Sequence, residues 1–247
     1  MQNSENLLSE ETLLVAIDDT DTVDSEYGTG KVSRFLGAHL ESELAPLSYL
    51  GSVRQQLLID PRVPYTTHNS AACLVIEWPE AQMPDQVIST AATFLSDIAA
   101  DGSDPGLCVS RVEDVSEPIR EFGLEAGDEV VEESRAYRLA ADTEIFLEEY
   151  GGTGEGVIGA LAAVGRTATG MHGRFIDFKE IRSLKGSIPI ATVREQGIEV
   201  RNSDGDEIHE GTLDTGDWVR PEMRTGSPIL EVNIQDTGNY RATNLDE

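Results

Sequence analysis

The chain of 247 residues has little lysine and a large excess of acid. Only three lysines occur, Lys31, Lys179 and Lys185, while acidic residues outnumber basic ones 46 to 18. The acidic excess runs along the whole chain, which is typical of a folded surface suited to molar salt, where self-repulsion is screened. We therefore expect a protein from a halophile, and binding of nucleic acid by a broad basic surface is disfavoured.

Cysteine is also scarce, and long apolar runs are absent. Cys73 and Cys108 lie in apolar stretches, so we expect buried, reduced thiols, and two cysteines are too few for a zinc ribbon. No run of about 18 apolar residues exists, and the first residues lack a basic segment followed by an apolar one. These absences predict a soluble, cytoplasmic protein without a membrane span.

The order of the expected elements predicts a mixed α/β (α+β) fold. In the first half, apolar periodicity and turn residues predict strands over 12–18, 47–59, 71–78 and 107–112, with helices over 30–44 and 85–99.

The second half begins with an acidic segment, 113–135, which we expect to be a seam or an exposed helical connection. A helix is expected over 134–149, and a small-residue helix should follow the glycine-rich turn 151–156. The last third is rich in β-branched residues and turns, which favours antiparallel strands and loops. We therefore predict two regions, 12–135 and 136–247.

Three aspartates follow the first apolar run, in "VAIDDTD". Asp18, Asp19 and Asp21 would lie at the mouth of a buried strand, where two carboxylates can share one side. Such a pair suits Mg²⁺, which binds proteins through one or two carboxylates together with phosphates. The alternative is a solvated acidic loop in an acidic protein.

A short glycine-containing turn, "GTGK", opens the next helix. The free backbone N–H groups near Gly28, Thr29 and Gly30 favour a phosphate, and Lys31 would add a positive charge. Val32 follows the lysine where a P-loop needs Ser or Thr, so this is not a Walker A motif. The alternative is a helix start without a ligand.

Two further stretches are candidate binding loops. The turn 151–156 supplies Gly154 and Gly156 ahead of a small-residue helix, although a tight turn and close helix packing would explain it equally well. The stretch 60–78 places two prolines, hydroxyl and amide groups and His68 before a strand. A lone histidine is more often a surface residue than a catalyst.

Taken in order, these stretches resemble the archaeal tRNA agmatinylcytidine synthetase (TiaS) family. The matching words are "VAIDDTD", "DPRVPYTTHNSAACLVIEW", "SDPGLCVS" and "GEGVIGALAAVG", with a weaker echo in "HGRFIDFKEIR" and "TLDTGDWVRPEMRTGSPILEV". The resemblance implies a kinase-like domain packed with a ferredoxin-like domain. It also implies that ATP and Mg²⁺ are used to phosphorylate a tRNA cytidine, whose phosphate the agmatine amine then displaces.

By this resemblance Asp18, Asp19 and Asp21 are the catalytic and metal-holding residues. Thr29 and Ser33 are the hydroxyls nearest the expected phosphate loop. We do not expect the family's OB-fold or zinc ribbon in this sequence, so a grip on tRNA would come from a separate chain.

The leading hypothesis is therefore an ATP- and Mg²⁺-dependent phosphotransferase or ligase. Its partners would be a nucleotide and either agmatine with tRNA or a free small molecule. The alternatives are a nucleotide-binding paralogue without catalysis and an α/β protein whose acidic turn has no ligand.

Overall fold

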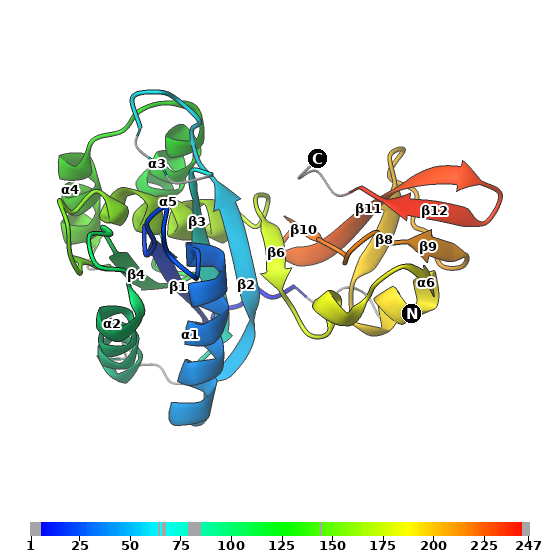
Figure 1. Ribbon diagram of the computed structural model, residues 1–247, viewed down its shortest axis with the longest axis horizontal. Coiled ribbons are helices and arrows are strands. Elements are labelled where there is room, and N and C mark those ends of the chain that lie inside the picture. Colours follow the sequence, from blue (N-terminus) through cyan, green and yellow to red (C-terminus); the bar gives the residue numbers. More distant parts are fainter. Residues whose placement is uncertain (1–5, 64, 66–67, 79–84, 144, 244–247) are drawn as a thin grey trace.

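The computed structural model describes residues 6–63, 65, 68–78, 85–143 and 145–243. Within these ranges the chain forms a mixed α/β fold with a twelve-stranded sheet and six α-helices, so the predicted fold class is confirmed. Two lobes are visible, joined through neighbouring strands near the middle of the molecule (Figure 1).

The first lobe is built on four antiparallel strands. They are β1 (Thr12–Asp18), β2 (Ser48–Gln56), β3 (Ser70–Glu77) and β4 (Gly106–Arg111), and their order in the sheet is β4-β1-β3-β2. Helix α1 (Thr29–Glu43) connects β1 to β2, and α2 (Asp85–Ile98) connects β3 to β4. This βαββαβ order is the ferredoxin-like split-βαβ arrangement.

Both faces of this sheet are covered by helices. Successive residues of a strand point to opposite faces, so Leu13, Val15 and Ile17 pack with α1 and α2, whereas Leu14 and Ala16 pack on the other face. Helix α5 (Gly156–Ala168) covers that second face, and α3 (Glu117–Asp128) packs on α5. The alternation therefore directs the side chain after Ile17, that of Asp18, toward α5.

Two expectations for the middle of the chain need correction. Of the two alternatives for 113–135, an exposed connection is wrong, because α3 buries Ile119 and Phe122 completely against α5, whereas a seam there stays a prediction. The helix expected over 134–149 ends early: α4 spans Glu133–Thr143, and Phe146–Glu149 forms strand β5, which pairs with the edge of β4. Unpaired backbone on the edge of β4 favours this strand over more helix.

The second lobe starts at β6 (Arg174–Asp177), which pairs with β2 on one side and β10 (Glu222–Arg224) on the other. The remaining elements are a 3₁₀ turn at Ile181–Ser183, β7 (Ser187–Pro189), α6 (Ile190–Glu195), β8 (Glu199–Asn202), β9 (Thr212–Asp214), β11 (Ser227–Asp236) and β12 (Asn239–Ala242). Most pairs are antiparallel as expected, but β8 pairs with β11, and β9 with β12, in parallel.

The predicted division between residues 135 and 136 remains a prediction. Helices α4 and α5, which follow it, pack with the first lobe, and this packing favours a proposed division after α5. The two cysteines are buried and not disulfide-bonded. None of the helices in the described residues is long and apolar enough to span a bilayer.

Candidate functional site

A pocket of about 420 Å³ lies where the C-terminal end of β1 meets the N-terminal ends of α1 and α5. The start of β3, the loop before it, the end of α3 and the β6 region complete its walls. The size suits a small organic ligand. Two helix N-termini face one cavity, and each favours an anion.

Asp18 lies against the helix that covers the sheet. A Cβ atom built on Gly159 of α5 would stand 1.7 Å from Oδ2 of Asp18, so only glycine leaves room for this carboxylate. Burial raises the pKa of Asp18 to about 7, and the negative charge of Asp19 contributes to the rise. A positive charge that enters the pocket would therefore stabilise the ionised form of this carboxylate.

Asp19 occupies a strained turn at the same strand end. Its φ of 48° is in the left-handed region, which non-glycine residues seldom adopt. Its carbonyl oxygen accepts a bond from the Asp104 amide at 3.1 Å, which helps to hold the turn. Burial raises the pKa of Asp19 to about 6, and the charges of Asp104, Asp21 and Glu155 contribute to the effect.

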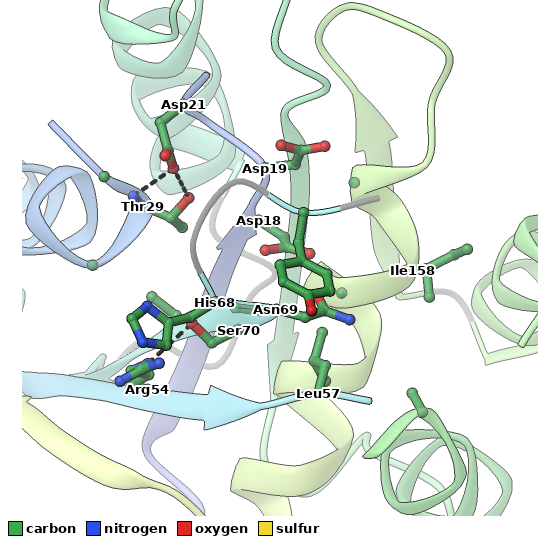
Figure 2. A pocket seen from close by; sticks show the side chains of 18 of the residues that line it. Asp18, Asp19, Asp21, Thr29, Arg54, Leu57, His68, Asn69, Ser70 and Ile158 are labelled. Atoms are coloured by element: carbon green, nitrogen blue, oxygen red, sulfur yellow. Dashed lines mark hydrogen bonds between the residues drawn. The ribbon is translucent and has the colours of Figure 1, made fainter. Parts of the chain in front are cut away.

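Asp21 holds the beginning of α1. Its Oδ1 accepts bonds from the backbone amide and the hydroxyl of Thr29, both at 2.9 Å, as Figure 2 shows. The Thr29 hydroxyl also accepts a bond from the Thr20 hydroxyl at 3.1 Å. Asp21 therefore acts as a remote N-cap of α1, a role that the sequence spacing did not indicate.

The other predicted residues of the first turn are divided between pocket and core. Gly28, Gly30 and Lys31 line the pocket, and the Lys31 ammonium lies 4.0 Å from the ring centre of Tyr27. Ser33 is fully buried, and its hydroxyl donates to the Gly30 carbonyl at 3.0 Å.

The second glycine-rich turn is tied to a residue that the sequence analysis missed. The carboxylate of Asp104 accepts hydrogen bonds from the Gly154 amide at 2.7 Å, from the Thr153 hydroxyl at 2.8 Å and from the Thr153 amide. Gly154 is not among the residues that line the pocket, whereas Gly156 is. A Cβ on Gly156 would stand 1.9 Å from the Asp104 carbonyl, so this glycine permits close packing of α5 on the backbone that leads into β4.

The opposite wall comes from β2, β3 and the loop between them. Figure 2 shows His68, Asn69 and Ser70 on this side, with Leu57 below them and Ile158 of α5 facing across. Arg54 donates to the Ser70 hydroxyl at 3.0 Å. Part of the loop expected to bind a ligand, residues 64, 66 and 67, lies outside the described residues.

Charge is distributed unusually around this cavity. Four of the 18 lysine and arginine residues in the chain line it, and they are Lys31, Arg34, Arg54 and Arg182. Five carboxylates also line it, those of Asp18, Asp19, Asp21, Glu129 and Glu155. Cations are thus more frequent here than in the whole chain, which indicates a ligand with negative groups.

The carboxylates of the pocket suit a metal ion only if a bound ligand supplies further oxygen atoms. Within the described residues, no group of three or more His, Cys, Asp or Glu side chains is arranged to hold a metal. Mg²⁺ usually takes one or two carboxylates, and phosphates or water supply the other oxygens. Asp18 and Asp19 both line the pocket and both have raised pKa values, so their carboxylates suit such a cation.

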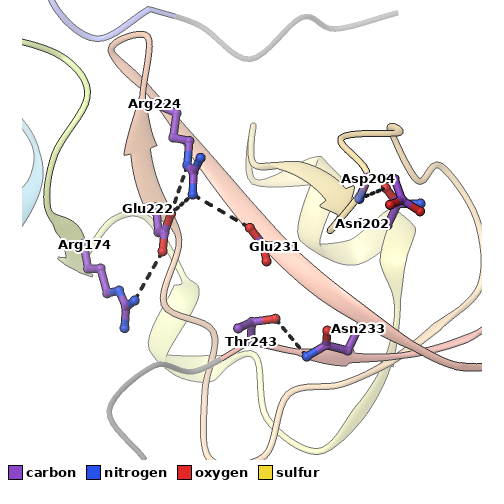
Figure 3. A network of polar contacts seen from close by, with 8 residues as sticks. All are labelled: Arg174, Asn202, Asp204, Glu222, Arg224, Glu231, Asn233 and Thr243. Carbon is purple, nitrogen blue, oxygen red and sulfur yellow. Dashed lines mark hydrogen bonds and ion pairs between the residues drawn. The ribbon is translucent and has the colours of Figure 1, made fainter.

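A second hollow, of about 310 Å³, lies in the C-terminal lobe and has a different character. Three of its charged residues, Glu222, Arg224 and Glu231, form a network with Arg174 beside it, shown in Figure 3. Arg224 pairs with Glu222 at 2.5 Å and with Glu231 at 3.8 Å, and Arg174 pairs with Glu222 at 3.2 Å. Because its charges are balanced locally, this hollow offers less to a charged ligand.

Comparison with known proteins confirms the resemblance expected from the motifs. No family model matches the chain. The chain is 28% identical over 158 residues to the tRNA 2-agmatinylcytidine synthetase TiaS of Pyrococcus horikoshii, a match that covers 62% of this chain and 35% of the relative. The match thus spans about a third of the length of that curated relative.

Solved structures give the same likeness at the level of the fold. The crystal structure of a tRNA fluorescent labeling enzyme is 24% identical, with a TM-score of 0.51, and covers 62% of this chain and 36% of that one. A complex of TiaS with an isoleucine tRNA and ATP is 22% identical, with a TM-score of 0.52, and covers 63% of this chain and 36% of that one.

Proposed function

We propose that this chain binds ATP with Mg²⁺ in the pocket at the end of β1 and transfers a phosphoryl group, as a TiaS-like phosphotransferase or ligase. The observation that carries the proposal is the close approach of the Asp18 carboxylate to Gly159. It brings a carboxylate with a raised pKa to the first turn of α5, in a pocket that basic side chains also line. The motif resemblance to TiaS supports the same interpretation.

In this proposal Asp18 and Asp19 hold the cation, and Asp21 keeps the loop and α1 in position through Thr29. Mg²⁺, when bound, supplies positive charge that neutralises the phosphate oxygens. The carboxylates would fix the position of the cation, because β1 and the strained turn at Asp19 hold them in place. Their negative charge, costly in the pocket on its own, would thus be compensated on binding.

The phosphates themselves would lie between the two helix N-termini. The backbone near Gly28 and Gly30 and the start of α5 at Gly156 supply partial positive charge, and Lys31 adds a full charge. Phosphoryl transfer depends mainly on positioning and on electrostatic stabilisation of the charge on the transferred group. These elements provide both without a protein nucleophile.

For the acceptor, we propose a tRNA cytidine, with agmatine as the amine. The relative is named for a tRNA and for agmatinylcytidine, and the acidic residues of the pocket would attract a cationic amine. Because the surface is strongly acidic, with a net charge of −28, a separate chain would supply the RNA grip. A free small molecule as acceptor is the alternative within this class.

A non-catalytic nucleotide-binding paralogue is the second candidate. It is favoured by the role of Asp21, whose carboxylate is engaged in capping α1, so one of the three motif aspartates already has a structural task. Such a protein would bind ATP but transfer nothing.

Turnover distinguishes the two. The purified chain would be incubated in molar KCl with γ-labelled ATP and Mg²⁺, with tRNA, agmatine or both, and the label followed into RNA and into free phosphate. We expect acceptor-dependent consumption of ATP that Asp18→Asn abolishes and Asp24→Asn preserves, because Asp24 lies in the same loop but is exposed and outside the pocket lining. Binding of ATP without consumption under every acceptor would support the paralogue instead.

A further inference from the structure

We propose that Arg34 and Arg182 form a phosphate-binding subsite in this pocket and that Trp218, from the C-terminal lobe, positions Arg182. The inference deepens the proposed function and rests on it for the source of the phosphate. It assigns to the C-terminal lobe a part in building the site.

The subsite begins where β6 lies against α1. A Cβ on Gly30 would stand 3.1 Å from Cδ1 of Ile176, so the two elements are in close contact at the pocket wall. Arg34 follows Gly30 by four residues and therefore lies on the same face of α1. Its Nε lies 3.7 Å from Oδ1 of Asp177, the residue after Ile176.

Arg34 is incompletely satisfied by this contact. A separation of 3.7 Å is too long for a hydrogen bond, and the Nε atom is buried with no hydrogen-bond partner among the described residues. The other oxygen of Asp177 accepts a bond from the Tyr49 hydroxyl at 3.2 Å. Asp177 therefore compensates the charge of Arg34 only in part, and Arg34 lines the pocket, where a ligand anion could complete the compensation.

Arg182 reaches the same pocket from the 3₁₀ turn after β6. One of its nitrogens donates to the Ile176 carbonyl at 2.8 Å, and its guanidinium lies 4.3 Å from the ring centre of Trp218. The guanidinium of Arg220 also lies over the Trp218 ring, 4.2 Å from its centre. Two hydrogen bonds to the carboxylate of Asp217 hold Arg220 in place. A stacked, hydrogen-bonded guanidinium is pre-organised to receive a planar pair of oxygens.

The two arginines have only partial compensation. Burial lowers the pKa of Arg182, and the positive charge of Arg34 lowers it further, which places two like charges near each other. The negative charge of Asp177 acts on both, and that of Asp217 acts on Arg182 against the repulsion from Arg220, but neither carboxylate is among the residues lining the pocket. An anion in the pocket would therefore relieve the repulsion between them.

Phosphate is the anion that this geometry fits best. Guanidinium groups bind phosphate through paired, charge-assisted hydrogen bonds, and two of them on different elements can hold one phosphate from two sides. A cationic amine would be repelled here, so agmatine would lie nearer to the aspartates. The phosphate has two possible sources, the triphosphate of the nucleotide and the phosphodiester of an RNA acceptor.

The test uses two probes without metal, so that it does not depend on Mg²⁺-dependent ATP binding. Inorganic tripolyphosphate stands for the nucleotide phosphates, and cytidine 3′,5′-bisphosphate stands for an RNA nucleotide. Affinities are measured by calorimetry in molar KCl with a chelator, for the wild type, Arg34→Gln, Arg182→Gln and the control Arg138→Gln. Arg138 is exposed on α4 and outside the pocket lining.

We expect each pocket variant to weaken binding of at least one probe by about 10-fold or more, because a charge-assisted bond to a partly buried anion is lost. The control should change neither affinity. Loss for tripolyphosphate identifies the nucleotide as the source, and loss for the bisphosphate identifies the acceptor. Unchanged affinity for both probes in Arg182→Gln, or no binding of either by the wild type, overturns the proposal.

The positioning role of Trp218 is tested by a double-mutant cycle. Trp218→Leu should weaken the same probe as Arg182→Gln, while Trp218→Phe, which keeps an aromatic face, should recover most of the affinity. In the Arg182→Gln background, Trp218→Leu should have no further effect. An additive loss in that background would show that Trp218 acts by some other route and would overturn this part.

Discussion

Replacing Gly159 by alanine is the sharpest single change that the structure offers. The new Cβ would stand 1.7 Å from Oδ2 and 2.5 Å from Cγ of Asp18, and the three nearest atoms all belong to that side chain. To reach an ordinary contact of 3.4 Å, the carboxylate oxygen must move by about 1.7 Å. A shift of this size in a positioning group costs on the order of 100-fold in affinity or rate.

The fold should tolerate the change. Alanine is favoured over glycine inside a helix by about 1 kcal/mol, which offsets part of the strain of moving one side chain. A matched control lies six residues further along α5. Alanine at Gly165 would meet the backbone carbonyl of Ile119 at 2.2 Å, which cannot move without separating α3 from α5.

The two variants should therefore separate site from scaffold. In calorimetric titrations with ATP and Mg²⁺, Gly159→Ala should lose about two orders of magnitude in affinity while its unfolding midpoint stays near that of the wild type. Gly165→Ala should instead lower the midpoint in denaturant. Wild-type affinity in a folded Gly159→Ala protein would refute the reasoning, because the ligand would then not depend on the place of the Asp18 carboxylate.

The aspartates of the site support three more predictions. Since the pKa of Asp18 is raised to about 7, the contribution of this group to stability is present in full below about pH 4 and is lost as the pH rises through 7. Asp18→Asn should therefore be more stable than the wild type at pH 8, by at most about 4 kcal/mol, and equal to it near pH 4. Denaturant titrations of chelator-treated protein at the two pH values measure this difference. Asp104→Ala should loosen the glycine-rich turn and cost about 1 to 3 kcal/mol, and faster amide exchange at Gly154 would reveal it. Asp21→Ala should remove the cap on Thr29 and cost about 1 kcal/mol of unfolding free energy, and no loss would show that the cap is dispensable.

Much of the fold follows from local patterns. The apolar run that ends at Asp18, the helical spacing after Gly28 and the small-residue helix after Gly156 all appear where the sequence predicts them. The buried face of α3 was also present in the sequence, since Ile119, Phe122 and Ala126 recur at helical spacing. The dense acidic residues between them, which occupy the solvent side, hid that pattern.

Strand β5 could not be predicted in the same way. Its four residues, Phe146–Glu149, continue a sequence typical of a helix, and only the open edge of β4 makes an extended backbone favourable there. Such a partner is distant in sequence, so local propensity does not contain it. The parallel pairing of β8 with β11 depends on distant contacts for the same reason.

The candidate site divides along the same line. The sequence located Asp18 and Asp19 at a strand mouth, and their role as ligands stays a prediction. Asp104 and Arg182 were missed because they are distant in sequence and meet the pocket region only after folding. The sequence does show Gly159 as a glycine inside a helical pattern. Only the contact with Asp18 explains why a side chain is not accommodated at this position.

The most direct test of the central claim is a calorimetric titration with ATP in molar KCl, with and without Mg²⁺, on the wild type, Asp19→Asn and the exposed-loop control Asp24→Asn. Burial and neighbouring carboxylates raise the pKa of Asp19 to about 6, so a bound cation should be stabilised by the negative charge of this carboxylate. We predict saturable binding that requires Mg²⁺, is lost in Asp19→Asn and is kept in Asp24→Asn. Absence of binding in the wild type, or equal binding in Asp19→Asn, would contradict the account.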